Sequence, residues 1–197
     1  NLGSINLAKF VQAKAIDWDR LRQVTHIAVR LLDNVIDAGT YPLPQITDTV
    51  RANRRIGLGV MGWADMLYKL RVAYNSEQAF ALAEKVMRFI YSVSHDESEK
   101  LAQEKGVFEN WKGSTYEKKG IKQRNVALTT IAPTGTISMV ADCSSGIEPI
   151  YALSYIKNVV DEAGLTYVNP LFEKALEESV ENELKRQEIL EQVAQTG

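Results

Sequence analysis

Hydroxyl-bearing and small residues gather in one short segment, residues 132–138, which has the composition of an anion-binding loop. Pro133 fixes one backbone dihedral, and Gly135 permits a tight turn between an apolar stretch and a following helix. Backbone N–H groups at the start of a helix attract an anion, and three hydroxyl donors add to them, Thr134, Thr136 and Ser138. No lysine lies in the segment, so it is not the P-loop of ATPases. The segment favours a phosphate held by neutral donors, and an ordinary turn with Thr and Ser caps is the alternative.

A second glycine-rich segment, residues 57–62, matches the G-x-G-x-x-G pattern of dinucleotide-binding folds. That fingerprint follows a strand of several residues, and residues 54–56 leave little room for one. It also requires a second strand that ends in an acidic residue, whereas the corresponding region, 76–84, has a helical pattern. We therefore interpret the segment as a glycine-rich strand that packs closely against neighbouring backbone. A nicotinamide-binding oxidoreductase is kept as an alternative.

The other reactive residue types form no recognisable catalytic or metal site. Cys143 is the single cysteine, has no histidine near it in the sequence, and is interpreted as a small buried thiol. His26 and His95 fall within helical patterns, and one Cys with two scattered His gives no metal-ligand spacing. Asp33 and Asp37 lie four residues apart on one helix face, which we interpret as solvated helix charges. The sequence therefore predicts no catalytic residue and no metal ligand in this chain.

Helices are expected to form most of the scaffold that positions these residues. Asp17 can cap a helix whose apolar residues recur at spacings of three and four, and Gly39 ends it. Further helices are predicted over 45–53, 64–70 and 76–104. The residues predicted to form one buried stripe on the first helix are Leu21, Val24, Ile27, Ala28, Leu31, Leu32, Val35 and Ile36.

Short apolar strands are predicted between these helices, and residues 107–123 read as a loop. The predicted strands cover 54–62, 126–131 and 150–160, and the second of them leads directly into the segment 132–138. A helix is expected to begin near Thr136, and two more follow over 169–178 and 182–194. Helices interleaved with short buried strands predict an α/β fold.

The composition bounds the class of protein. The chain has 197 residues, of which 45% are hydrophobic, which is enough to bury the core of one domain. Its net charge of −2 gives no basic excess for binding nucleic acid, and no apolar run is long enough to cross a membrane. The start of the chain has neither the pattern of a signal peptide nor an initiator Met, so we expect a cytoplasmic protein whose chain begins inside a longer one.

Three segments, in order, resemble the large subunits of ribonucleotide reductases. Asn1–Leu7 looks like the stretch that follows a redox cysteine, and Arg55–Asp65 looks like an internal barrel strand with the start of its helix. Residues 132–138, with 144–149, look like the substrate-phosphate loop and the next strand. The resemblance implies that residues 1–197 are a single partial domain, the later portion of the family's ten-stranded α/β barrel, helix-rich with short buried strands.

The resemblance implies a function for the full-length enzyme. Such an enzyme reduces a ribonucleoside diphosphate, or less often a triphosphate, to the deoxyribonucleotide that DNA replication consumes, by thiyl-radical chemistry. The residues that map onto the phosphate-binding stretch are Pro133, Thr134, Gly135, Thr136 and Ile137. No residue is carried over as catalytic.

Two details favour the adenosylcobalamin-dependent class of the family. They are the Thr-Gly-Thr-Ile-Ser form of the loop at residues 134–138 and the stretch Val168–Phe172. The alternative is the diferric class, in which a diiron subunit supplies the radical. We expect no cofactor to be bound by this chain on its own.

The chain also departs from the family pattern. The finger-loop Asn-x-Cys-x-Glu motif and the redox cysteines are absent, and Cys143 alone cannot supply a two-electron dithiol. We therefore expect a fragment that is inactive by itself and that self-associates through barrel-strand edges left uncovered. The alternative is a non-catalytic split subunit, or an excised domain, that completes a barrel with a partner chain.

Overall fold

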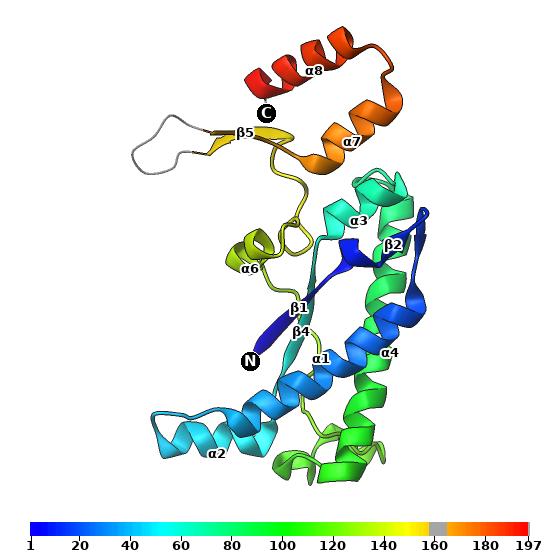
Figure 1. The fold of residues 1–197 in the computed structure, drawn as a ribbon. Helices are drawn as coiled ribbons and strands as arrows, with labels where there is room; N and C mark the ends of the chain where they lie inside the picture. The colour runs from blue at the N-terminus through cyan, green and yellow to red at the C-terminus, as the bar shows by residue number, and fades with distance from the viewer. Residues whose placement is uncertain (158–164, 197) are drawn as a thin grey trace. The chain divides into compact units, whose positions relative to one another are not determined.

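The computed structural model describes residues 1–157 and 165–196 (Figure 1). The chain divides into two compact units, Asn1–Ile147 and Glu148–Gly197. The first unit contains β1 (Leu2–Asn6), the 3₁₀ helix η1 (Leu7–Phe10), β2 (Val11–Gln12), β3 (Ala15–Ile16), α1 (Trp18–Ala38), α2 (Pro44–Asn53), β4 (Gly57–Met61), α3 (Trp63–Leu70), α4 (Glu77–Lys105), η2 (Glu109–Trp111), α5 (Thr115–Lys118) and α6 (Gly135–Val140). The second contains β5 (Ser154–Lys157), β6 (Leu165–Val168), α7 (Pro170–Ser179) and α8 (Glu183–Thr196).

The centre of the first unit is the buried strand β4. It pairs in parallel with β1, in a register that runs from Leu2 opposite Gly57 to Asn6 opposite Met61. All five residues of β4 are buried, as expected for a parallel strand covered on both faces. The strand predicted over 54–62 is thus confirmed for residues 57–61.

The segment that leads into the predicted phosphate loop lies along the other edge of β4, but it is not the regular strand predicted over 126–131. Leu58 donates to the Leu128 carbonyl at 2.7 Å and accepts from the Thr130 N–H at 3.1 Å, which makes one parallel bridge. Ile56 then bonds to the Ala127 carbonyl at 3.1 Å instead of the one a residue earlier. This break in the two-residue spacing interrupts the ladder and leaves an extended segment.

Helices α1 and α4 pack against each other, and α1 also packs against β1 and β4 (Figure 1). Their starts are those predicted: the Asp17 side chain accepts from the Arg20 N–H at 3.0 Å, and the Ser76 hydroxyl accepts from the Ala79 N–H at 3.2 Å. The core between them is apolar, and its most buried members are Leu7, Leu21, Val29, Ile36, Leu58, Val60, Met66, Ile90 and Leu101.

The predicted buried stripe of α1 is wrong for three of its residues. Ile27, Leu31 and Val35 are 66%, 59% and 41% exposed. They recur every four residues and so form one row, and the face turned to the core is the adjoining row that includes Thr25 and Val29. The apolar arc of α1 is therefore wider than the surface that the described elements cover.

The second unit is a hairpin followed by two helices. Strands β5 and β6 pair antiparallel, from Ser154 opposite Val168 to Lys157 opposite Leu165. The strand predicted over 150–160 is confirmed for 154–157, and residues 158–160 lie outside the described part of the chain. Both predicted helices are present as α7 and α8, and α7 is capped by Asn169, whose side chain accepts from Leu171 N–H at 2.9 Å. No helix among the described residues is long and apolar enough to cross a membrane.

Candidate phosphate-binding site

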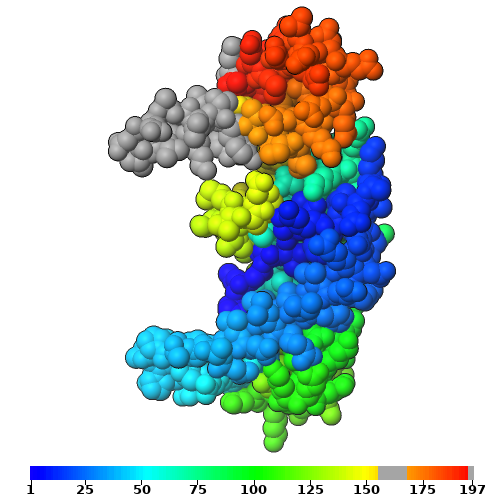
Figure 2. All heavy atoms as spheres, in the orientation of Figure 1, coloured from blue at the N-terminus to red at the C-terminus, as the bar shows by residue number. Residues whose placement is uncertain are grey.

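The predicted phosphate loop, residues 132–138, turns sharply into the six-residue helix α6. Thr134 makes the turn with the left-handed dihedrals φ 55° and ψ 26°, and α6 begins at the next residue. Pro133, Gly135, Thr136 and Ile137 are exposed, whereas Thr134 is buried. The N–H groups of the first helical turn have no acceptor within α6 and point away from it. Figure 2 shows the atoms of α6, in yellow-green, standing out on the surface.

The hydroxyl groups of the loop do not all face solvent as the sequence suggested. The Thr134 hydroxyl accepts the Gly146 N–H at 2.6 Å. The Ser138 hydroxyl is 3.0 Å from the Gly135 carbonyl and 2.8 Å from the Ser145 hydroxyl. Two of the three hydroxyls therefore hold the loop in shape, and the exposed one that can reach a ligand is that of Thr136.

A second segment, residues 144–146, holds the loop through hydrogen bonds. Gly146 has a positive φ of 45°, and a Cβ at this position would lie 2.7 Å from the Ala132 carbonyl oxygen. Its N–H is the group that binds Thr134. Gly146 is glycine because the two backbone segments approach too closely for a side chain.

A buried polar network anchors the chain that leads into the loop, and sequence reasoning missed it. The Asn125 amide donates to Asp33 Oδ1 at 2.9 Å and to the Arg54 carbonyl at 3.0 Å, and its oxygen accepts from the Ser98 hydroxyl at 2.9 Å. Arg54 Nε also donates to Asp33 Oδ1, at 2.9 Å. These four residues join α1, α4 and the ends of α2 and of the extended segment, so they set where the extended segment begins.

The interpretation of Asp33 and Asp37 as solvated helix charges is wrong for Asp33, which is fully buried. Asp37 is half-exposed and receives two hydrogen bonds from Arg54, at 2.8 and 2.9 Å. Those hydrogen bonds hold the pKa of the Asp37 carboxyl below its usual value. The spacing of four residues between Asp33 and Asp37 was the one signal of this network in the sequence. Pairs of carboxylates on exposed helix faces have the same spacing, so it could not distinguish the two cases.

The other reactive side chains singled out in the sequence are Cys143, His26 and His95. Burial, together with the carboxylates of Asp65 and Asp142, raises the pKa of the half-buried Cys143 thiol to about 11, so it is protonated and a poor nucleophile at neutral pH. His26 binds Glu97 at 2.9 Å, and His95 packs on Tyr91. Within residues 1–157 and 165–196, no cluster of three or more His, Cys, Asp or Glu could hold a metal ion.

The glycines of the dinucleotide-like pattern serve packing. A Cβ on Gly57 would lie 2.5 Å from a methyl carbon of Leu2, and one on Gly59 would lie 3.1 Å from the Thr130 carbonyl oxygen. Strand β4 is therefore packed closely between β1 and the extended segment that contains Thr130. This supports the interpretation as a closely packed glycine-rich strand.

The sequence model of one family, described as the ribonucleotide reductase barrel domain, matches residues 1–196. The chain belongs to the ribonucleotide reductases. The family and its α/β barrel fold class, expected from three short motifs, are thereby confirmed, and the reading as an independent nicotinamide-binding enzyme is set aside.

The reductase chain is similar along all of its length to two vitamin B12-dependent ribonucleoside-diphosphate reductases. It is 54% identical over 198 residues to that of Thermoplasma acidophilum and covers 25% of that relative. It is 42% identical over 197 residues to that of Mycobacterium tuberculosis strain H37Rv and covers 27% of it. With the ribonucleoside-diphosphate reductase subunit alpha of Chlamydia pneumoniae, identity is 30% over 197 residues, 80% of this chain and 19% of the relative. The resemblance to the B12-dependent class is confirmed, and the chain spans about a quarter of the length of those relatives.

Proposed function

We propose that this chain supplies the substrate-phosphate loop of a ribonucleotide reductase that reduces ribonucleoside diphosphates to deoxyribonucleotides. Pro133, Thr134, Gly135, Thr136 and Ile137 form the site, and the observation that carries the proposal is the sharp left-handed turn at Thr134 into α6. It leaves the N–H groups of the first helical turn exposed, while hydrogen bonds from Ser145 and Gly146 hold the loop in place. Because the family model covers residues 1–196, we further propose that both compact units belong to one barrel domain.

Each residue of the site has a distinct task in this proposal. The N–H groups of Gly135, Thr136 and Ile137 donate to phosphate oxygens, and the Thr136 hydroxyl adds a fourth donor. Pro133 has no N–H and holds the chain in one direction before the turn. Thr134 contributes the turn itself, since its side chain is buried and its hydroxyl accepts the Gly146 N–H. The site binds charge with neutral groups and orients the ribose end of the substrate without taking part in bond breaking.

The radical chemistry belongs to other parts of the enzyme in this proposal. A two-electron reduction by thiols requires a pair of them, and Cys143 is the chain's single cysteine. The chain by itself is therefore inactive, and the full-length enzyme works in the cytoplasm.

Adenosylcobalamin is the proposed cofactor of the full-length enzyme, as in the relatives named for vitamin B12. It would supply the radical. Two open grooves, of about 680 and 400 Å³, lie where the start of α1 meets α4, and none of their lining residues belongs to the phosphate loop. We assign this cofactor no residue of this chain.

Replacing Thr136 by valine tests the phosphate site. The exchange keeps the side-chain shape and removes the exposed hydroxyl, so binding of a nucleoside diphosphate should weaken by about 1 kcal/mol, or roughly fivefold in Kd. Titration of the ¹⁵N-labelled chain should also move the amide resonances of Gly135, Thr136 and Ile137. Thr115→Val, at an exposed threonine in the first turn of α5, is the control and should leave Kd unchanged. Resonances that stay in place at millimolar diphosphate would overturn the proposal.

We also propose that the isolated chain self-associates through the exposed row Ile27, Leu31 and Val35 of α1. Sedimentation velocity at rising concentration should show a dimer or larger species. Leu31→Glu should shift that equilibrium towards monomer, because it places a charge in the middle of the row. Leu184→Glu, at a residue that is 78% exposed on α8, should have no such effect. A wild-type chain that is monomeric throughout the concentration range would contradict the proposal.

A further inference from the structure

Helix α3 begins without a capping side chain of its own. Its N-cap residue is Gly62, which has no side-chain oxygen to accept the free N–H groups of the first turn. The missing acceptor comes from a residue 79 positions later: the Asp65 N–H donates to the Ser144 hydroxyl at 3.3 Å. Ser144, from the segment that is hydrogen-bonded to the phosphate loop, therefore caps α3.

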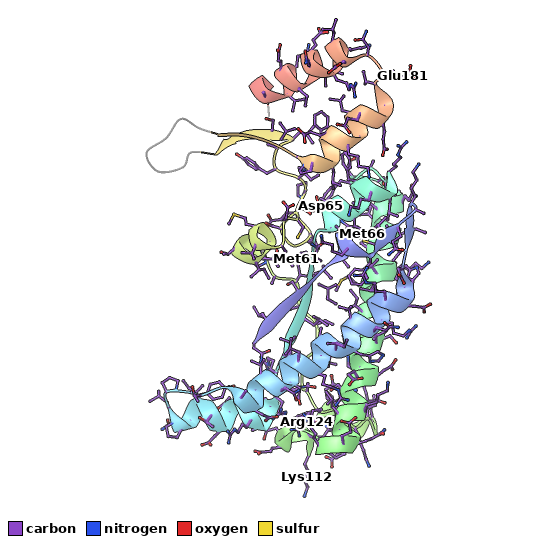
Figure 3. All side chains as sticks on the ribbon, viewed as in Figure 1. Met61, Asp65, Met66, Lys112, Arg124 and Glu181 are labelled. Carbon is purple, nitrogen blue, oxygen red and sulfur yellow. The ribbon has the colours of Figure 1, made fainter. Side chains whose placement is uncertain are left out.

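The contact between the two segments is reciprocal. The Ser144 N–H donates to Asp65 Oδ2 at 2.6 Å, and the Ser144 carbonyl accepts the Gly62 N–H at 2.7 Å. This is the bonding of a capping box, with Asp65 at the third helical position, except that the serine belongs to a distant part of the chain. Asp65 is 6% exposed, so its charged hydrogen bond is shielded from water. Figure 3 shows Asp65 where α3 begins, next to the segment that follows α6.

The residues directly after Ser144 carry this contact to the phosphate loop. The Ser145 hydroxyl bonds the Ser138 hydroxyl at 2.8 Å, and the Gly146 N–H donates to the Thr134 hydroxyl at 2.6 Å. Thr134 and Ser138 are the two buried residues of the loop, and they flank the first turn of α6. Consecutive residues thus connect the start of α3 to both ends of the turn that carries the exposed N–H groups.

We propose that Asp65 and Ser144 are positioning residues that set the place of the phosphate loop, an inference that rests on the proposed function. A carboxylate repels a phosphate. Asp65 is therefore suited to act through its hydrogen bonds with Ser144, and not by contact with the substrate. Loss of the carboxylate leaves the Ser144 N–H without its acceptor and frees residues 144–146 to shift. The loop then keeps its donors but no longer presents them in one arrangement.

The test compares three variants of the chain in their affinity for a nucleoside diphosphate. Asp65→Ala removes the acceptor and should raise Kd about tenfold. Asp65→Asn keeps an oxygen of similar size in place and should restore Kd to within about threefold of the wild type. Val93→Ala is the control, because it removes buried methyl groups from α4 and lowers stability without touching the loop. Its Kd should equal that of the wild type.

A second readout uses no ligand. Amide hydrogen exchange at Ser144, Gly146 and Ser138 should be faster in Asp65→Ala than in Val93→Ala at equal loss of thermal stability. If the wild type binds diphosphate and Asp65→Ala binds it equally well, the positioning role is overturned while the phosphate site stands. If the wild type does not bind, the proposed function fails. The role of Asp65 in holding the loop is then decided by exchange alone, and equal rates in the two variants would overturn it.

Discussion

Replacing Asp33 by alanine is expected to lower the free energy of unfolding by about 3–5 kcal/mol, because it leaves buried partners without their counter-charge. Arg54, which is 4% exposed, loses its bond from Nε, and the Asn125 amide loses an acceptor. Lys105 and Arg124 also direct cationic nitrogens at the second carboxylate oxygen, at 3.7 and 3.5 Å. Asp33 is therefore within salt-bridge distance of three cations, of which Arg54 is also paired with Asp37. Urea unfolding followed by circular dichroism measures the loss of stability.

Asp37 provides the matched control for this experiment. It lies one turn further along α1 and binds the same guanidinium, but its side chain is 49% exposed. Water can replace it, so Asp37→Ala should cost no more than about 1 kcal/mol. Equal losses from Asp33→Ala and Asp37→Ala would show that burial of the network contributes nothing, contrary to the interpretation given above.

Replacing Gly62 by alanine is expected to cost roughly 2–5 kcal/mol, the sum of a left-handed backbone and a steric overlap. Gly62 has a φ of +70°, and a Cβ there would lie 2.5 Å from Asn6 Oδ1. Asn6 cannot simply move away, because the same oxygen caps η1 by accepting the Ala8 N–H at 3.1 Å. The substitution should therefore disturb β1 and the start of α3 together.

Gly120 separates the two contributions to that cost. Its φ of +68° is almost the same, yet no atom lies within 4 Å of the position of its Cβ. Gly120→Ala should therefore cost only the backbone strain of about 1–2 kcal/mol. The difference between the two variants in urea unfolding measures the close approach at Gly62. If both variants lose the same stability, the overlap is relieved without cost and the close packing around β4 is less strict than the distances indicate.

Local signals predicted most of the helices and the position of the loop. Asp17, Ser76 and Asn169 mark helix starts because a side-chain oxygen next to an apolar repeat satisfies N–H groups within the same few residues. The Pro-Thr-Gly-Thr stretch also predicts a tight turn into a helix, although the residue with left-handed dihedrals is Thr134 and not Gly135, which begins α6. These features depend on neighbours in sequence, so they could be read without the fold.

Sequence alone thus determined the family, the boundaries of the longer helices and the residues that could donate to a phosphate. The tertiary structure decided which of those donors face solvent: Thr134 is buried and its hydroxyl accepts the Gly146 N–H, whereas Thr136 is exposed. It also decided that Asp33 is buried while Ile27 is exposed, an inversion that no helical repeat predicts. Burial and hydrogen-bond partners come from segments as far apart as Asp33 and Asn125, and their meeting depends on how α1, β4 and the extended segment pack. The sequence of one helix does not show which other segments pack against it. Those segments determine whether a polar group of the helix binds a ligand or another part of the protein.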